Sequence, residues 1–333
     1  TSNMNTSKLP SATLDTSSDS IEVRPLTEAT LGAKPTPYCN TGGYEISKEN
    51  IKLEKPAFNN QDSITALDWL RLTTNDLKSY RDTIGELTTS IELGVVAQDD
   101  QCTGILEEAG MQVHWTDKGL HGYEHSASIK IWKDNDYVTV GNIAYSEGGR
   151  NNGGLFELTG VGCKVLQLEY PALWLELYNV LLLAEWRISR VDIALDLSGD
   201  YAQEHGYSVP LLFKQAVNEG LFKADGQRNP LMKQSFQTAG DWSPLVCGNL
   251  SAETYDPLQH CTGGLTAYVG NRKSSDDFFR IYEKGKQLLG AMAEPESIDR
   301  GWVRIEHEMS RKASGRTIPL DVMLRPDEYF CSG

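Results

Sequence analysis

Short runs in which apolar and polar residues alternate predict a sheet along much of the chain. The first run covers residues 64–73, and Thr74 or Asn75 is placed to cap a helix that extends to about residue 91. Four further β-favouring runs, separated by Gly, Asn and Asp, follow at 112–116, 123–132, 137–145 and 155–159. Their close spacing predicts an antiparallel meander.

Helical patterns and strand-like runs are mixed in the second half of the chain. Pro171 opens a stretch to residue 184 whose apolar residues recur at helical spacing, and proline suits a first helical turn. A second helix is predicted over 209–219, with Gly220 as its C-terminal cap. Strands are predicted at 186–197, 264–270, 278–284 and 302–310, and a short terminal helix is predicted after Ile318 and Pro319. Together these elements predict an α+β fold with a mostly antiparallel central sheet packed with helices.

The first part of the chain differs in composition from the rest. Residues 1–61 combine Ser, Thr and Asn with Pro35, Pro37 and Pro56 and have few periodic apolar positions. We therefore expect a disordered or loosely ordered N-terminal arm over 1–61. Residues 62–333 are expected to form one domain, with a division into two α+β halves, 62–185 and 186–333, as the alternative.

Composition limits the partners and the compartment. The 46 acidic and 31 basic residues give a formal net charge of −15, which counts against a nucleic-acid partner unless basic residues cluster locally. No apolar run is long enough to span a membrane and nothing resembles a targeting segment, so we expect a cytoplasmic protein with no membrane partner. The cysteines form no CxxC or Cys/His cluster, which argues against a zinc ribbon and a disulfide framework; they are Cys39, Cys102, Cys163, Cys247, Cys261 and Cys331.

Three of the predicted strands carry charged residues on one face. Side chains at alternate positions of a strand point the same way. The residues that share a face are Arg190, Asp192 and Asp196 in the first strand, Arg280, Tyr282 and Lys284 in the second, and Arg304, Glu306 and Glu308 in the third. If these strands are neighbours, a cluster of carboxylates faces a tyrosine and several cations.

Such a cluster suits phosphoryl chemistry. Gathered carboxylates repel one another, and Mg²⁺ or Mn²⁺ is the usual counter-ion because it prefers oxygen ligands and also polarises a phosphate. A tyrosine hydroxyl, with an ordinary pKa of ~10, becomes a nucleophile only when a neighbouring base or cation activates it. The alternative is a solvated strand face with cross-strand ion pairs and an ordinary half-buried Tyr282. His307 falls on the opposite face and is expected to be packed in the core.

Four sequence motifs, taken together and in their order along the chain, are recognisable. They are Arg-Val-Asp-Ile-Ala-Leu-Asp at 190–196, Gly-Leu-Thr-Ala-Tyr-Val-Gly-Asn-Arg-Lys-Ser at 264–274, Arg-Ile-Tyr-Glu-Lys-Gly-Lys-Gln at 280–287 and Trp-Val-Arg-Ile-Glu-His-Glu at 302–308. In this order they resemble the replication initiation factors of filamentous phages and small rolling-circle plasmids, the Rep_trans type. The resemblance covers 62–333 and implies a replication initiator nuclease domain there.

The resemblance implies a rolling-circle replication initiator, a metal-dependent, site-specific endonuclease and strand transferase. It nicks one strand of double-stranded origin DNA at a single-stranded or cruciform site, leaves a 5′-phosphotyrosine link and a free 3′-OH, and later rejoins the strand. Matched residue by residue, Tyr282 is the nucleophile and Lys284 and Arg304 contact phosphate. Asp192 and Glu306 are the principal ligands of Mg²⁺ or Mn²⁺, with Asp196 and Glu308 as further candidates. The family also implies a host helicase and polymerase as partners, with a homodimer as an open alternative.

The local charge agrees better with DNA binding than the total charge does. Residues 265–316 hold ten basic and eight acidic residues, a net charge of +2, and a bound metal would offset part of the acidic charge. Arg272 and Lys273 on the predicted hairpin loop are the best candidates for DNA contact, with Arg190, Arg280 and Lys286 as others, although a solvated turn is the alternative for the loop. Family members continue past residue 333, so we expect that a C-terminal region for origin binding or dimerisation is missing here.

Two alternative functions remain open at this stage. One is a non-catalytic protein that binds origin or promoter DNA, and the other is a metal-dependent phosphoesterase that uses water. A carboxylate-pair glycosidase is a distant third, because only scattered Trp residues could supply a sugar platform. Only the nickase loses its chemistry on Tyr282→Phe while it still binds DNA.

Overall fold

The protein is described here as a computed structural model. It describes residues 65–89, 103–116, 118–133, 135–148, 151–184, 186–197, 199–222, 234–246, 250–259, 264–289 and 299–330. The predicted N-terminal arm, residues 1–61, lies outside the described residues.

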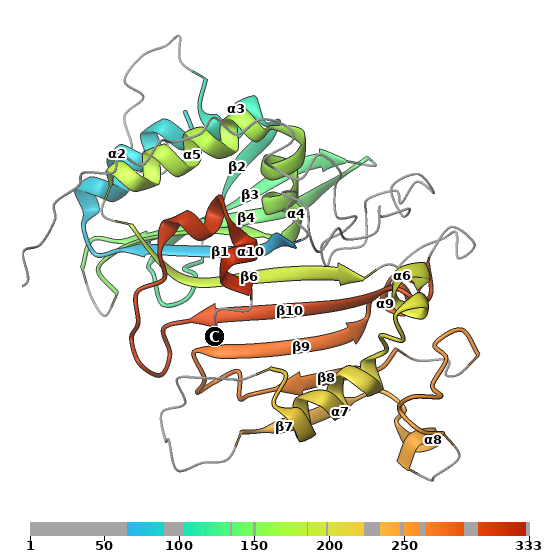
Figure 1. Ribbon diagram of the computed structural model, residues 1–333. Helices are drawn as coiled ribbons and strands as arrows, with labels where there is room; N and C mark the ends of the chain where they lie inside the picture. Colours follow the sequence, from blue (N-terminus) through green and yellow to red (C-terminus); the bar gives the residue numbers. More distant parts are fainter. Residues whose placement is uncertain are drawn as a thin grey trace, which may run out of the picture.

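Strands from the described ranges form a ten-stranded sheet in the order β2-β3-β4-β5-β1-β6-β10-β9-β8-β7 (Figure 1). Every neighbouring pair in it is antiparallel. The strands are β1 (Thr65–Thr74), β2 (Met111–Thr116), β3 (His125–Lys133), β4 (Asp136–Ser146), β5 (Gly153–Thr159), β6 (Arg187–Leu197), β7 (Phe236–Ala239), β8 (Thr266–Val269), β9 (Asp277–Glu283) and β10 (Val303–Ser310). The predicted α+β class and the predicted meander, β2–β5, are confirmed.

The helices lie before and after the meander β2–β5 and between the later strands. They are α2 (Leu77–Leu87), α3 (Ile105–Glu108), α4 (Gly160–Lys164), the π-helix η2 (Val165–Glu169), α5 (Pro171–Leu183), α6 (Gly199–Glu204), α7 (Val209–Glu219), α8 (Ser243–Val246), α9 (Lys284–Leu289), the 3₁₀-helix η4 (Leu320–Met323) and α10 (Pro326–Phe330). The predictions for α5 and α7 are confirmed, with Pro171 in the first turn and Gly220 as a left-handed cap at φ 67°.

Three predicted boundaries were wrong. Asp76, and not Thr74 or Asn75, caps α2, because its carboxylate accepts hydrogen bonds from the backbone N–H groups of Lys78 and Ser79. The helix ends at Leu87 rather than near residue 91, since Thr88 is already extended. The predicted strand 278–284 ends one residue early, and Lys284 begins α9 instead.

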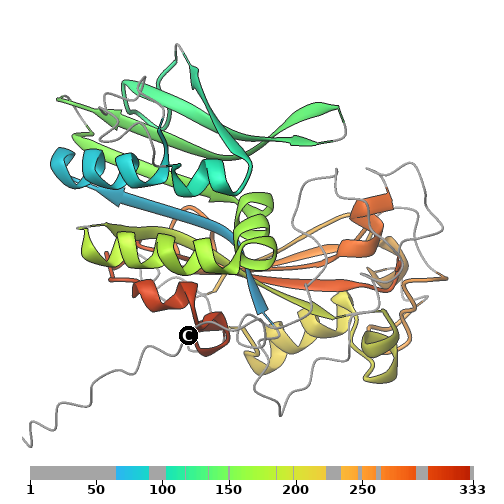
Figure 2. The ribbon, with the colours of Figure 1, turned by 90° about the horizontal axis from the view of Figure 1, so that it is seen from above.

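The main helices pack on one face of the sheet. Seen from above, α2, α5, α10 and α7 lie on the same side of the strands (Figure 2). Fully buried apolar side chains fill the space between these helices and the sheet; they include Leu70, Leu72, Ile129, Leu158, Ile193, Ala267 and Ile281. The opposite face of the central strands therefore presents the alternate, polar positions.

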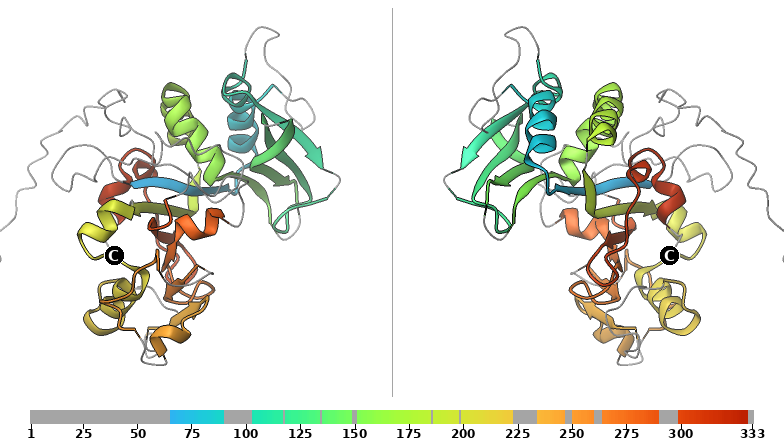
Figure 3. Two further views of the ribbon diagram at one scale, coloured as in Figure 1. Left: turned by 90° about the vertical axis from the view of Figure 1, so that its right-hand side faces the viewer. Right: turned by 90° about the vertical axis from the view of Figure 1, so that its left-hand side faces the viewer.

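The sheet is strongly twisted, so the meander β2–β5 turns away from β8–β10 in the side views (Figure 3). β1 lies between β5 and β6, and it joins the strands of 62–185 to those of 186–333 in one sheet. Among the described residues, no helix is long and apolar enough to cross a membrane.

Candidate active site

The structure places β6, β10 and β9 side by side, as the charge pattern required. The cross-strand register aligns Asp196 with Arg304 and Arg304 with Tyr282, and it aligns Glu306 with Arg280. We call the resulting polar surface the charged face; its residues are Asp68, Arg190, Asp192, Asp196, Arg280, Tyr282, Lys284, Arg304, Glu306 and Glu308. Side chains far apart in the sequence are thus brought together by strand pairing alone.

Tyr282 lies at the centre of the charged face and is only 4% exposed. Its hydroxyl donates a hydrogen bond of 2.5 Å to Oε1 of Glu306. The guanidinium carbon of Arg280 lies 5.0 Å and Nζ of Lys284 5.7 Å from the centre of its ring. Burial and the nearby Glu306 charge raise the pKa of Tyr282 well above its ordinary value, so the phenol keeps its proton in the resting site.

Glu306 is the acceptor for that proton. Burial raises its pKa, but Arg280, Arg304 and the Tyr282 hydroxyl together hold the pKa below the ordinary value of a glutamate. Glu306 is therefore ionised beside a neutral tyrosine. This is the arrangement of a nucleophile with an adjacent base.

Lys284 stands where β9 passes into α9 and is fully buried. Burial and the Arg304 charge lower its pKa to about 8. Its ammonium donates to the side-chain oxygen of Gln287 at 3.1 Å. A lysine with this pKa is protonated at neutral pH and gives up its proton more readily than an exposed lysine.

Arg304 is buried and fixed by two carboxylates. Its Nε and Nη2 donate to Asp196 at 2.6 Å each, and its Nη1 donates to Asp68 at 3.0 Å. Asp196 also accepts from the indole N–H of Trp302 at 2.8 Å. Arg304 is therefore held in one position next to Tyr282, its partner across β10 and β9.

Asp68 belongs to the charged face although the alternation of β1 assigns it to the core. It has the same parity as Leu70 and Leu72, which are fully buried. The register shifts between Leu67 and Trp69, which leaves Asp68 as the extra residue of a β-bulge. The bulge turns its carboxylate toward Arg304, and a bulge gives no signal in the hydrophobic pattern.

Asp192 and Glu308 form the other end of the charged face, paired across β6 and β10. Arg190 donates to both oxygens of Asp192 and lies 3.2 Å from Glu308. Burial raises the pKa of Asp192 to about 6; Arg190 lowers it, while Glu308 and Glu306 raise it further. The pKa of Asp192 is therefore raised mainly because burial outweighs the stabilisation that its single arginine gives to the charged form.

The four predicted metal ligands do not fit a metal ion as the structure places them. Both oxygens of each carboxylate already accept a hydrogen bond: Asp192 from Arg190, Asp196 from Arg304 and Trp302, Glu306 from Tyr282 and Arg280, and Glu308 from Arg272 and Lys312. Within the described ranges, no three His, Cys, Asp or Glu side chains are grouped so that they could hold a metal. Bound arginine and bound Mg²⁺ compete for the same oxygens.

The predicted DNA contacts divide into three groups. Arg272, 53% exposed, donates to Glu308 at 2.8 Å from the loop between β8 and β9, and Lys273 beside it is exposed. Arg280 and Arg190 belong to the charged face. Lys286 lies apart from them, in a buried cluster where its ammonium donates to Tyr255 and Glu283 at 3.1 Å each.

His307 lies on the opposite face, and the expectation that it is packed is confirmed. It is fully buried, its Nδ1 donates to the Phe330 carbonyl at 2.9 Å, and its Nε2 lies 2.8 Å from the Asp277 carboxylate. Its ring stacks on Phe279 with centroids 4.3 Å apart. His307 therefore connects α10 to β9 and β10 beneath the charged face.

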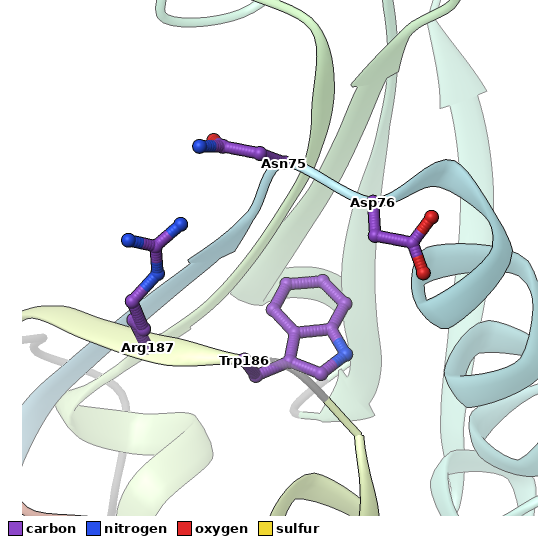
Figure 4. Close-up of a pocket in the computed structure, with 4 residues that line it drawn as sticks. All are labelled: Asn75, Asp76, Trp186 and Arg187. Atoms are coloured by element: carbon purple, nitrogen blue, oxygen red, sulfur yellow. The ribbon is translucent and has the colours of Figure 1, made fainter.

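Two cavities border these elements. One, of about 250 Å³, is lined by Thr266, Tyr268, Arg280, Tyr282, Gln287 and their neighbours, so it opens directly beside the tyrosine. The other, of about 420 Å³, lies at the start of β6, at the opposite end of that strand from Asp196; Figure 4 shows its lining residues Asn75, Asp76, Trp186 and Arg187. In this second cavity, the carboxylate of Asp76 caps the N-terminus of α2 and therefore has a structural role.

Comparisons with known proteins show a similarity to solved structures. No family model matches the chain, and no curated protein matches it. Among solved structures, the rolling-circle replication initiator protein from Geobacillus stearothermophilus is similar in structure, with 18% sequence identity over 79% of each chain and a TM-score of 0.41. At that identity, the similarity assigns no role to any side chain.

Proposed function

We propose that this protein is a rolling-circle replication initiator that nicks one strand of origin DNA with Tyr282 as its nucleophile. The observation that carries the proposal is the 2.5 Å hydrogen bond from the Tyr282 hydroxyl to ionised Glu306, between Arg280 and Lys284. The four sequence motifs that resemble the initiators of phages and small plasmids supply these same side chains. The proposal rests on this site and on those motifs.

The nicking step needs a base, an acid and a site for phosphate. The Tyr282 oxygen attacks phosphorus while its proton passes to Glu306, and a bond forms between tyrosine and the phosphate. The bond from phosphorus to the 3′ oxygen breaks, and Lys284 donates a proton to that oxygen, which leaves a free 3′-OH. Arg280, with 26% of its side chain exposed, binds the phosphate, and Arg304 offsets the charge that develops on it.

Covalent chemistry suits an enzyme that must rejoin what it cuts. The 5′-phosphotyrosine link keeps the energy of the broken bond, so attack by a 3′-OH restores the DNA without ATP. In that reverse step, the 3′-OH gives its proton back to Lys284, and the tyrosine oxygen recovers a proton from Glu306. The host polymerase would use the free 3′-OH in the meantime.

Metal binding at the charged face is part of the proposal on the condition that two arginines move. Mg²⁺ or Mn²⁺ at Asp192 and Glu306, with Asp196 and Glu308 as further ligands, requires that Arg190 and Arg280 first leave these carboxylates. A DNA phosphate is a competitor that could draw both arginines away. No part of the proton transfer above depends on the metal.

The test is a search for the covalent link. We would incubate the protein with Mn²⁺ and supercoiled DNA that carries its own gene and flanking sequence, and we expect nicked circles with protein attached. Tyr282→Phe should abolish the adduct while DNA binding is retained, and Tyr137→Phe, an exposed tyrosine on β4, should leave it unchanged. Nicking without an adduct would favour the water-using phosphoesterase, and binding without nicking would favour the non-catalytic DNA-binding protein.

A further inference from the structure

The cavity beside Tyr282 has a floor made of two cross-strand pairs. Thr266 on β8 lies opposite Tyr282 on β9, and Tyr268 lies opposite Arg280. Gln287, an exposed residue of α9, forms part of its wall. The nicking step uses Tyr282 and Arg280 from this set and leaves Thr266, Tyr268 and Gln287 without a role.

The side chains that line this cavity are suited to bind the phosphate and the base of a nucleotide. Arg280 is a donor for phosphate, and the half-buried ring of Tyr268 is an aromatic surface of the kind on which bases stack. The Thr266 hydroxyl and the Gln287 amide can donate and accept hydrogen bonds at a base edge. A cation finds poorer partners here, because the carboxylate of Glu283 already accepts from Tyr255 and from the backbone N–H of Leu265.

The Tyr268 ring is held in place before any ligand arrives. It stacks on Phe278 with ring centroids 5.9 Å apart and planes 19° apart. β8 is itself paired on both sides, with β7 and β9. A ring fixed in this way loses little conformational freedom when a base stacks on it.

The spacing also suits a strand of DNA that crosses the two β-strands. Tyr268 and Tyr282 are diagonal neighbours on β8 and β9, and such positions are about 7–8 Å apart. This is comparable to the step between successive nucleotides of an extended single strand. Inside a duplex the faces of a base are covered by its neighbours, so a base can reach Tyr268 only when it is unstacked.

We propose that this cavity is a subsite for one unpaired nucleotide next to the phosphate that Tyr282 attacks, with the Tyr268 ring stacked on its base. The proposal rests on the proposed function and adds a side chain, Tyr268, that holds the base beside the attacked phosphate. Tyr268 is a binding and positioning residue, and Tyr282 remains the nucleophile.

The first test compares two single-stranded probes on the intact protein. Fluorescence anisotropy would give the affinity of each protein for a twelve-nucleotide oligothymidylate and for an abasic strand of the same length. The proteins compared are the wild type, Tyr268→Ala, Tyr268→Leu and Tyr268→Phe. The alanine and leucine variants should bind the thymidylate about 5- to 100-fold more weakly, the range expected for loss of one stacked base. Their affinity for the abasic strand should stay unchanged, and Tyr268→Phe should bind both strands like the wild type.

A matched control and a second measurement keep the result unambiguous. Tyr137→Ala removes a tyrosine that is 40% exposed on the distant β3–β4 hairpin, and it should not change either affinity. In the unmutated protein, a thymidylate strand carrying 5-iodouracil should cross-link to Tyr268 on irradiation, as peptide mapping would show. This measurement needs no variant to fold.

Three results would overturn the subsite: equal loss on both probes, equal loss in Tyr137→Ala, or cross-links that avoid Tyr268. The adduct assay with Tyr282→Phe judges the proposed function separately. If the adduct forms and any of these three results is obtained, only the subsite proposal is overturned. A wild-type protein that binds neither probe also overturns the subsite, and the adduct assay then decides the proposed function.

Discussion

Lys284 is the cation of the charged face whose charge changes just above neutral pH. It is fully buried between Tyr282 and the carboxylates of Asp68, Glu306 and Asp196, and burial with the Arg304 charge lowers its pKa to about 8. Below that pH the amine is protonated and can act as an acid. Above it the amine is neutral and can neither donate a proton nor attract a phosphate.

We therefore expect the rate of adduct formation to fall as the pH rises through about 8. Lys284→Arg should remove this fall, because a guanidinium keeps its proton above pH ~12, and it should slow adduct formation at every pH, because such a group is a poor proton donor. Single-turnover rates measured on both sides of pH 8 would test this, with thermal unfolding of the variant as the control for folding. A fall at the same pH in Lys284→Arg would show that another group is responsible.

At the residue scale, the sequence predicted which side chains share a face but not which ones pair. Alternation placed Asp192, Tyr282 and Glu306 together because the strands that carry them are regular there. It missed Asp68, because a bulge reverses the side on which that residue lies. It also missed the pairing of Arg280 with Glu306, which depends on the register between β9 and β10 and on no local pattern.

At the element scale, the junction between β9 and α9 positions Lys284, the proposed acid, next to Tyr282, the proposed nucleophile. The backbone N–H of Gly285 donates to the Trp302 carbonyl at 3.2 Å. A Cβ atom at Gly285 would lie 1.9 Å from the Asp299 carbonyl oxygen, which is backbone and cannot swing aside. A glycine after Lys284 thus lets α9 begin against the segment that leads into β10.

Gly285→Ala should destabilise the protein by about 1–3 kcal/mol, the range for overpacking, and should slow adduct formation because Lys284 is displaced. Urea unfolding and the adduct assay would measure the two effects. Gly148→Ala is the matched control, since a Cβ there meets nothing within 4 Å. Wild-type stability in Gly285→Ala would refute the packing argument.

Sequence patterns found the long elements and missed α4 and η2. Gly160 and Gly162 are poor helix formers, so propensity argues against a helix at that point. In the structure, a Cβ at Gly162 would lie 2.2 Å from the Val140 carbonyl oxygen, so the glycine allows α4 to pack closely on β4. Tertiary packing of this kind outweighs local helix propensity. It cannot be predicted from the spacing of hydrophobic residues in the sequence.

At the scale of the whole molecule, the charged face is nearly neutral within a protein of net charge −15. Its five carboxylates are Asp68, Asp192, Asp196, Glu306 and Glu308, and the cations that bind or face them are Arg190, Arg272, Arg280, Arg304, Lys284 and Lys312. The acidic excess therefore lies elsewhere. The face offers DNA a surface that repels phosphate less than the total charge implies.

The same balance predicts weak metal binding in the absence of DNA. We expect Mn²⁺, followed by electron paramagnetic resonance, to bind the free protein poorly and to bind Arg280→Gln at least about tenfold more tightly, because the variant frees an oxygen of buried Glu306. Arg81→Gln, which breaks an exposed pair with Glu147, should change nothing. Equal Mn²⁺ affinity in the wild type and Arg280→Gln would show that the arginine does not compete.

The position of β1 in the sheet determines the order in which the strands of a newly made chain can pair. β1 is the first of the described strands to leave the ribosome, yet it pairs Trp69 with Thr159 on β5 and Leu67 with Ile193 on β6. The hairpins of the meander close locally and fast, whereas these distant pairings must wait for their partners. β9 and β10 come later still, so Tyr282 meets Glu306 only after the strands from β1 to β6 have been synthesised. A nascent chain therefore assembles the charged face after the meander.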